Sequence, residues 1–377
     1  MTNCKVLVVF GTRPEAIKMA PVISALKARS CFDVKVCFTG QHKEMAEQVF
    51  SVFGIKPDFD LAVMKKGQTL LDVTGNILRS MGELFSQYRP DVILVQGDTT
   101  TVFVSALVAF YNKIPVAHVE AGLRTGDRYS PYPEEMNRLL TTGLSNIHFA
   151  PTELSRQNLL KENVCDSDIF VTGNTVIDAL FDAEKILLAN KELMASLDEK
   201  FAAVSADKKV ILITGHRREN HGEGIRNICA AIRHLAKRQD VELIYPVHPN
   251  PNINDVVSKE LAGLDNVHLI QPLDYLSFIY MMRRSFMVLS DSGGVQEEAP
   301  SLGKPVLCMR ESTERPEALE AGTVRLVGVD VRKIIAETEK LLDDPEEYHR
   351  RCSIANPFGD GTAAEKIADV LEERFCR

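Results

Sequence analysis

Short apolar runs recur along the chain, and each is followed by residues with the periodicity of an amphipathic helix. In the first half these runs are residues 5–10, 33–38, 91–96, 115–120 and 146–151, and in the second half 209–214, 241–247, 267–270, 286–290, 305–309 and 323–328. Alternation of this kind predicts parallel strands with helices on both faces of each sheet. Between the two series, residues 176–206 are charged and helix-like and carry no strand signal.

The two series predict two domains, which also fits a length of 377 residues. We expect an α/β fold of two Rossmann-like, doubly wound domains, residues 1–175 and 176–360, facing a cleft. A last helix-like segment, 361–377, follows the break NPFGDGT, and from its pattern alone it can pack on either domain. Ligands of such folds bind at the carboxyl ends of the strands, so candidate chemistry is sought there.

Composition narrows the class of protein. Apolar residues make up 45% and charged residues 25%, as in soluble globular proteins, and no run approaches the roughly 20 apolar residues of a membrane span. A net charge of −8 without a basic stripe disfavours nucleic acid as a partner. The 8 cysteines contain no CxxC pair, and MTNCKVLVVFG lacks the plan of a signal peptide, so we expect a reducing cytoplasm.

The first strand–helix junction has the sequence GTRPEAIKMAP, residues 11–21. Thr12 is a suitable N-cap, and Pro14 suits the first turn of a helix. Because a helix N-terminus carries partial positive charge, Arg13 beside it predicts an anion site, most naturally for phosphate. A solvated Arg13 and a simple tight turn at Gly11 explain this segment equally well.

Carboxylates follow consecutive strands of the first half. Asp98 follows one strand in GDTTTV, and Glu120 ends the next in HVEAGLRTGD. Glu134 and Glu135 stand at a helix start in SPYPEEMNR. Taken singly, Asp98 is better explained as an N-cap and the glutamate pair as a favourable interaction with the helix dipole. Because these junctions line one edge of a parallel sheet, together they predict general acids and bases, and Glu120, which has no local structural need, is the best candidate.

Cationic side chains follow strands of the second half. In TGHRREN, His216 and Arg217 can bind phosphate, and His216 can protonate a leaving group, whereas a solvated arginine pair is the alternative for Arg217 and Arg218. The segment PVHPNP around His248 is loop-like, and a structural role is at least as well supported.

The segment SDSGGVQEEAPSLGKP is more specific. Ser292, Gly293 and Gly294 open a helix directly after a strand, and paired glycines let backbone N–H groups approach a diphosphate closely. Glu298 lies one turn beyond Gly294, where a carboxylate can accept both hydroxyls of a ribose, although an exposed helix acid is the alternative. Arg315, at a helix start in STERPEAL, is a second phosphate candidate.

Motifs of other enzyme classes are missing from the sequence. No GxGxxG follows the first strand and no YxxxK occurs, which disfavours a nicotinamide-dependent enzyme. No HExxH or clustered His/Asp set points to a catalytic metal. We therefore expect neither a cofactor nor a metal.

The chain resembles the bacterial non-hydrolysing UDP-N-acetylglucosamine 2-epimerases. Its motifs, in order, are GTRPEAIKMAP, QHKEM, GDTTT, HVEAGLRTGDRYSPYPEEMNR, TGHRREN, PVHPNP, DSGGVQEEAPSLGKPVL and TERPEA, and the resemblance covers essentially the whole chain. It implies reversible conversion of UDP-N-acetylglucosamine into UDP-N-acetylmannosamine, which supplies ManNAc for surface polysaccharides. It also implies a glycosyltransferase-B fold, a last helix that returns to the N-terminal domain, and a homodimer.

The resemblance assigns expected roles to individual residues. The catalytic set is Arg13, Lys18, Asp98, Glu120, Glu134 and His216. The UDP-binding set is Arg13, His216, Leu273, Phe278, Ser292, Gly293, Gly294, Glu298 and Arg315. Family members are thought to eliminate UDP, giving a 2-acetamidoglucal, and to add it back after C2 is reprotonated on the other face. This chemistry requires charge stabilisation of the leaving phosphate and acid–base groups on both faces of the sugar.

Substrate activation is left open by the sequence. Several family members bind a second substrate molecule as an activator, through Gln-His-x-Gln and an arginine before a QTL segment. The positions that match an activator site are Gln41, His42, Arg217 and His248. Glu44 and Gly67 occupy the other two positions, which departs from the pattern.

Three other functions are compatible with the motifs. A hydrolysing relative would release free ManNAc and UDP, a glycosyltransferase would need an acceptor, and a catalytically dead sensor would only bind a UDP-sugar. A sensor needs the UDP-binding residues but not Asp98, Glu120 and Glu134, so the acids favour an enzyme.

Overall fold

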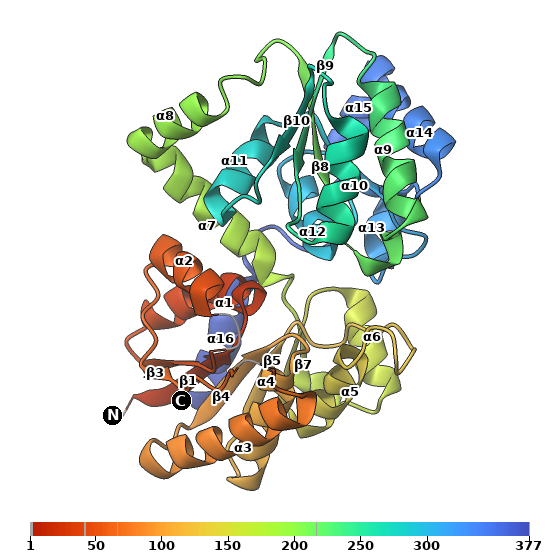
Figure 1. Cartoon of the computed structure of the whole chain (residues 1–377). Helices are drawn as coiled ribbons and strands as arrows, with labels where there is room; N and C mark the ends of the chain where they lie inside the picture. The colour runs from red at the N-terminus through yellow and green to blue at the C-terminus, as the bar shows by residue number, and fades with distance from the viewer. Residues whose placement is uncertain (1–2, 41–42, 66, 216, 377) are drawn as a thin grey trace. The chain divides into compact units, whose positions relative to one another are not determined.

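The computed structural model describes residues 3–40, 43–65, 67–215 and 217–376. The chain divides into two compact units, Met1–Asp182 with Phe358–Arg377 (unit 1) and Ala183–Pro357 (unit 2). Each unit contains one parallel sheet covered by helices (Figure 1), so the predicted α/β fold with two doubly wound sheets is confirmed.

The sheet of unit 1 has the strand order β3-β2-β1-β4-β5-β6-β7. Its strands are β1 (Cys4–Phe10), β2 (Phe32–Phe38), β3 (Phe59–Asp60), β4 (Val92–Gln96), β5 (Val116–Val119), β6 (Ile147–Ala150) and β7 (Ile169–Val171). The order reverses between β1 and β4, which pair in parallel. The connections from these two strands leave in opposite directions, which makes their carboxyl ends the topological switch point.

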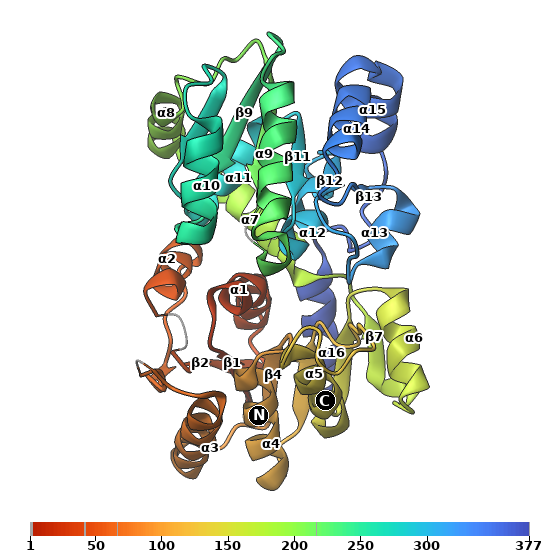
Figure 2. The ribbon, with the colours of Figure 1, turned by 45° about the vertical axis from the view of Figure 1, so that its right-hand side comes forward.

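Helices cover both faces of this sheet (Figure 2). They are α1 (Arg13–Lys27), α2 (Lys43–Phe53), α3 (Leu70–Gln87), α4 (Thr100–Tyr111), α5 (Glu134–Leu144), α6 (Glu153–Lys161), η1 (Asp166–Asp168), α7 (Thr175–Ala189) and α16 (Ala363–Phe375). Helices α3, α4 and α5 pack in one layer, while α1 packs against α2 and α16. Because both faces are covered, the central strands are continuously apolar, and all of β4 is buried.

The last helix packs on unit 1. Arg29, just after α1, donates hydrogen bonds to Glu365, Asp369 and Glu372 on α16. These contacts resolve the choice that the pattern of the segment leaves open.

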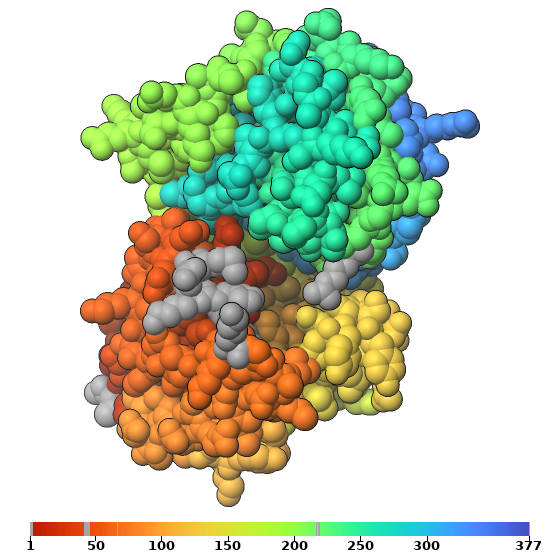
Figure 3. Space-filling model, in the orientation of Figure 1, coloured from red at the N-terminus to blue at the C-terminus, as the bar shows by residue number. Residues whose placement is uncertain are grey.

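The sheet of unit 2 has the order β10-β9-β8-β11-β12-β13, with the reversal between β8 and β11. Its strands are β8 (Lys209–Thr214), β9 (Val241–Pro246), β10 (Val267–Ile270), β11 (Met287–Ser290), β12 (Val306–Cys308) and β13 (Val324–Leu326). Its helices are α8 (Lys191–Lys200), η2 (Arg218–Asn220), α9 (Glu223–Leu235), α10 (Pro251–Leu261), α11 (Tyr275–Arg284), α12 (Gly293–Ser301), α13 (Pro316–Ala321), α14 (Val331–Asp343) and α15 (Pro345–Cys352). Alternate residues of β8, such as Ile211 and Ile213, share a core with α9, α10 and α14. The helices α9 and α10 lie over the sheet in Figure 1, and their atoms form the outer surface on that side of unit 2 in Figure 3.

Candidate active site

The helix after β1 begins at the switch point of unit 1 and carries three predicted side chains. Thr12 is the N-cap of α1 and forms a capping box with Glu15. Arg13 is the first helical residue and is half-buried. Lys18 lies one and a half turns further along the same helix. A cation at a helix N-terminus beside the carboxyl end of a strand favours an anionic ligand.

Glu120, directly after β5, has a backbone conformation rare for its residue type. Its φ is 65°, in the left-handed region that usually requires glycine. Its carboxylate pairs with the Lys18 ammonium and accepts a hydrogen bond from Gln96 Nε2 at 2.8 Å. The side chain is only 8% exposed. Strained residues held by their surroundings cluster at functional sites, so the structure strengthens the case for Glu120.

Asp98 lies at the end of the neighbouring strand, β4, and is also paired with a cation. Arg138 of α5 donates from Nε and Nη2 to its Oδ2 atom at 3.0 and 2.7 Å. The side chain of Asn137 donates to its backbone oxygen at 2.9 Å. The N-cap of α4 is Thr99 and not Asp98, so the interpretation of Asp98 as a helix N-cap is wrong.

The neighbouring acids Glu134 and Glu135 have different surroundings. Glu135 is buried, pairs with Arg138 at 3.0 Å, and accepts hydrogen bonds from the backbone N–H groups of Thr125 and Gly126. Glu134 is half-buried at the start of α5. Glu135 therefore holds structure together, which leaves Glu134 as the member of the pair that can act on a ligand.

The switch point of unit 2 is organised by Asp291, which is fully buried after β11. Its Oδ2 atom accepts hydrogen bonds from the Arg217 backbone N–H at 2.8 Å and from Asn220 Nδ2 at 3.1 Å. The loop after β8 is thus tied to the end of β11. His216 lies in that loop but outside the described residues.

Arg315 covers the N-terminus of α12. A Cβ atom added to Gly293 would lie 2.6 Å from Arg315 Nη1, so the guanidinium rests against the bare backbone of this glycine. Ser292 is the N-cap residue but makes no side-chain cap bond. Backbone donors and an arginine therefore meet at one helix N-terminus, as expected for a diphosphate site.

A buried ion-pair network holds Arg315 in place. Its Nε atom donates to Glu297 at 2.6 Å, and its Nη1 atom pairs with Glu314 at 2.8 Å. Burial opposes the charge on Glu314, but Arg315 and Arg310 outweigh it and lower the pKa of this carboxyl to about 2. The network fixes the orientation of the guanidinium.

The proposed nucleoside contacts lie on and before α11 and α12. Glu298 is 8% exposed and accepts a hydrogen bond from the Tyr275 hydroxyl at 3.3 Å. Leu273 precedes α11 and Phe278 lies within it, and both are half-buried.

Of the four predicted activator residues, the structure describes Arg217 and His248. His248 is exposed in the loop after β9, where its Nδ1 atom accepts a hydrogen bond from the Asn250 backbone N–H. Arg217 lies at the unit 2 switch point. Gln41 and His42 lie outside the described residues.

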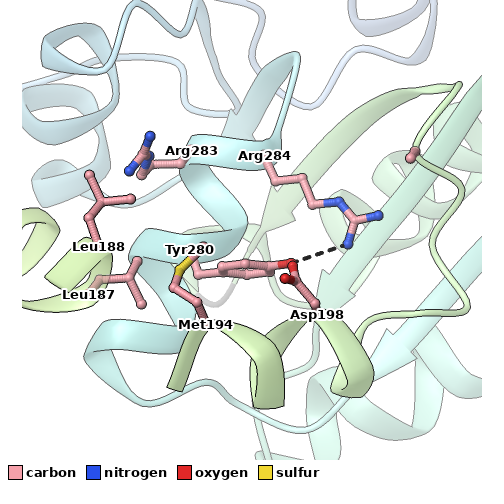
Figure 4. Close-up of a pocket in the computed structure, with 8 residues that line it drawn as sticks. Leu187, Leu188, Met194, Asp198, Tyr280, Arg283 and Arg284 are labelled. Atoms are coloured by element: carbon pink, nitrogen blue, oxygen red, sulfur yellow. Dashed lines mark hydrogen bonds between the residues drawn. The ribbon is translucent and has the colours of Figure 1, made fainter. Parts of the chain in front are cut away.

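A separate cavity of about 440 Å³ lies in unit 2 between α7, α8 and α11 (Figure 4). It is lined mainly by apolar side chains such as Leu187 and Met194, and Tyr280 donates a hydrogen bond to Asp198 beside it at 2.5 Å. Its α11 residues belong to the last turns of that helix, near the amino ends of the strands, and none is a predicted site residue.

The described part of the chain contains no group of three His, Cys, Asp or Glu side chains placed to hold a metal ion. Among the helices that the structure describes, none has the length and apolar character needed to cross a membrane.

Comparison with known proteins places the chain in a family. The family model described as UDP-N-acetylglucosamine 2-epimerase matches residues 24–372. The chain belongs to this family. UDP-N-acetylglucosamine 2-epimerases from Salmonella typhimurium and Escherichia coli K12 are 54% and 53% identical to it over 369 residues, 98% of each chain. The crystal structure of UDP-GlcNAc 2-epimerase from Neisseria meningitidis bound to UDP-GlcNAc superposes with a TM-score of 0.92 at 51% identity, covering 98% of this chain and 100% of that one.

The predicted 2-epimerase family and its glycosyltransferase-B type of fold are therefore confirmed. Sequence reasoning nevertheless missed the buried residues that support the candidate acids. His118 is fully buried on β5, and its Nε2 atom lies 2.7 Å from the Gly97 carbonyl oxygen. Burial lowers the pKa of His118 to about 3, so the ring is neutral and donates to this carbonyl. Glu15 was within reach of sequence reasoning, because Thr12 and Glu15 have capping-box spacing.

Proposed function

We propose that the chain catalyses reversible epimerisation at C2 of UDP-N-acetylglucosamine, giving UDP-N-acetylmannosamine. Unit 2 binds the nucleotide, and unit 1 supplies the acid–base groups that act on the sugar. The product supplies ManNAc for surface polysaccharide synthesis.

The observation that carries the proposal is the position of Asp98 and Glu120 at the ends of two neighbouring strands. They follow β4 and β5, which are hydrogen-bonded neighbours with Gln96 opposite Val119. Each carboxylate is held beside a cation, Glu120 beside Lys18 and Asp98 beside Arg138. Two oriented acids at adjacent strand ends suit proton transfer, whereas a binding protein has no need of them.

The proposed nucleotide contacts follow from unit 2. The N–H groups at the start of α12 and the Arg315 guanidinium bind the diphosphate, and Glu298 accepts the ribose hydroxyls. The uracil lies along residues 273–278, where the contact at Leu273 comes from its backbone. His216 and Arg13 complete the proposed set around the leaving phosphate.

The chemistry explains why several acids are needed. The C2 proton of the sugar is not next to a carbonyl, so its direct removal is too difficult. Elimination moves this proton to a base while the C1–O bond breaks, with its electron pair passing to the β-phosphate oxygen of UDP. Return of a proton to the other face of C2, followed by re-addition of UDP, gives the epimer. Glu120, Asp98 and Glu134 are the proposed acid–base groups, and the Lys18 ammonium lies beside the Glu120 carboxylate.

Turnover of UDP-N-acetylglucosamine without added cofactor or metal tests the proposal, with two variants that separate chemistry from binding. Glu120→Gln should abolish formation of UDP-N-acetylmannosamine while UDP still binds. Glu298→Ala should weaken UDP binding by about 1–3 kcal/mol, because partners of a buried acceptor lose their bonds. Full turnover in Glu120→Gln would remove Glu120 from the mechanism. Release of free ManNAc and UDP by the wild type would instead indicate a hydrolase.

We also infer a homodimer in a reducing cytoplasm. Large apolar side chains are exposed on α3 and α4, where Leu71 is 83%, Tyr111 69% and Phe110 56% exposed. These helices pack side by side, so their exposed side chains offer a surface for a second copy. The 8 cysteines are all free thiols, which supports the compartment.

A further inference from the structure

A buried carboxylate connects the two loops at the switch point of unit 1. Glu15 Oε2 accepts hydrogen bonds from the backbone N–H groups of Gly11 and Thr12, at 3.0 and 2.7 Å. Its other oxygen, Oε1, accepts one from the Thr99 hydroxyl at 2.7 Å. Gly11 and Thr12 follow β1, whereas Thr99 follows β4. One side chain therefore holds both loops.

Capping α1 does not by itself require this arrangement. The capping box of α3 pairs Thr69 with Asp72 in the same way, yet that box is exposed and its contacts are local. Glu15 is only 3% exposed, and this burial raises the pKa of its carboxyl despite the hydrogen bonds from Thr99, Thr12 and the backbone. Burying a carboxylate costs free energy unless hydrogen bonds or an opposite charge compensate for the lost water. The bond that the α3 box lacks is the one to the second loop.

Unit 2 also has a buried carboxylate that joins the two loops at its switch point. Asp291, after β11, accepts hydrogen bonds from the Arg217 backbone N–H and the Asn220 side chain, both after β8. The two carboxylates differ in which strand they follow. Glu15 follows β1, the earlier strand of the β1/β4 pair, and Asp291 follows β11, the later strand of the β8/β11 pair. Each joins the two loops that carry candidate ligand-binding residues.

The flanking residues show what Glu15 controls. Thr99 directly follows Asp98, and Arg13 lies between the two ends of the capping box. A carboxylate only accepts hydrogen bonds, so the Thr99 hydroxyl donates to it while accepting from the Val102 N–H at 3.4 Å. This fixes the Thr99 rotamer and the peptide next to Asp98.

We propose that Glu15 is a positioning residue that, through Thr99, fixes the loop of Asp98 relative to the helix carrying Arg13 and Lys18. The proposal rests on the proposed function. It concerns the geometry of the acid–base groups and not the binding of UDP, so it predicts an effect on kcat and little effect on UDP affinity.

The experiment compares variants that differ in the hydroxyl group of one threonine. Thr99→Val removes the donor, and Thr99→Ser restores it. Thr152→Val is the matched control, because Thr152 is the buried N-cap of α6, accepts a hydrogen bond from the Ser155 N–H at 3.1 Å, and follows β6 and not β1 or β4. We expect Thr99→Val to lower kcat at least tenfold, about 1.4 kcal/mol, with the UDP dissociation constant within twofold of wild type. Thr99→Ser should recover most of kcat, and Thr152→Val should lower Tm with kcat unchanged.

A double-mutant cycle with Glu15→Gln tests whether the two residues act as one unit. The double variant should then lose no more kcat than the worse single variant, because each change breaks the same link. The proposal would be overturned if the kcat loss of the double variant equalled the product of the two single losses. It would also be overturned if Thr99→Val had the kcat of the wild type.

Hydrogen exchange provides a readout that does not depend on turnover. Thr99→Val should speed exchange of the Gly11 and Thr12 amides at least tenfold, whereas Thr152→Val should not. Unchanged exchange at these amides would refute the link even in an active enzyme. A wild-type protein that fails to convert UDP-N-acetylglucosamine, yet shows the exchange effect, would contradict the proposed function and leave the link intact.

Discussion

Gly293 and Gly294 are adjacent in one motif, but the structure predicts opposite consequences for adding a methyl group to each. At Gly293 a Cβ would lie 2.6 Å from Arg315 Nη1 and 2.8 Å from Cζ, closer than real Cβ contacts allow. At Gly294 the nearest atom is Glu298 Oε2 at 3.5 Å, an ordinary contact. Gly293→Ala must therefore displace the guanidinium, whereas Gly294→Ala fits.

The size of the effect depends on how firmly Arg315 is held. It is bonded to Glu297, which is 0% exposed, at 2.6 Å and to Glu314 at 2.8 Å, so it cannot swing away without disturbing both pairs. Complete loss of one partner of a buried pair costs about 3–5 kcal/mol, and a forced shift in a packed interior about 1–3 kcal/mol. We take the lower range, which corresponds to a loss of UDP affinity between about 5-fold and 150-fold. Gly294→Ala should bind UDP as the wild type does and gain up to about 1 kcal/mol of helix stability.

Titration calorimetry with UDP, together with urea unfolding, measures both quantities. The reasoning predicts weaker UDP binding in Gly293→Ala alone, and double variants with Arg315→Met that lose no further affinity. Equal affinities for the two alanine variants would refute the assigned position of Arg315 over the helix N-terminus. Weak binding in Gly294→Ala would show that the backbone of that residue, and not Arg315, makes the critical contact.

Three other changes have directions set by the structure. Because the pKa of Glu314 is lowered to about 2, its charge stabilises the fold above pH 4.5, and this contribution is lost as the pH falls towards 2. Glu314→Gln should lose roughly 2–3 kcal/mol in urea unfolding at pH 7, and a deficit that persists undiminished at pH 3 would contradict the ion-pair assignment. The pKa of His118 is lowered from its usual 6.5 to about 3. The neutral ring therefore contributes its full share of folding stability above pH 6.5, and this stability is lost as the pH falls from 6.5 towards 3. His118→Gln keeps an Nε2 donor for the Gly97 carbonyl and should flatten the loss of stability between pH 6 and 4; an unchanged pH profile would show that His118 does not cause it. Tyr111→Lys should shift the mass measured by light scattering from two copies to one if α4 forms the dimer surface, and an unchanged mass would exclude that surface.

The positions of most strands and the loops that carry chemistry could be predicted from the sequence, because buried parallel strands leave continuous apolar runs and their carboxyl ends are identifiable. The strand order and the short strands β3 and β7 needed the structure. The assignment of Asp98 as more than an N-cap needed the structure, because Arg138 contacts it from 40 residues away. No local pattern distinguishes Glu134 from Glu135 either, since their difference arises from which one faces Arg138.

Two features of the fold depend on contacts that periodicity does not record. The unit boundary falls within α7, at Asp182, and a regular helix carries no mark where its contacts change from one unit to the other. The left-handed φ of Glu120 was likewise not predictable, because local preference at such a position favours glycine.

The central claim is that the enzyme exchanges the C2 proton of a UDP-sugar. Proton NMR of UDP-N-acetylglucosamine incubated with the protein in deuterated water, without cofactor or metal, tests this directly. We predict that UDP-N-acetylmannosamine appears and that deuterium enters C2 of both epimers. Epimer formed without deuterium at C2, or a substrate that remains unchanged while UDP still binds, would contradict the claim.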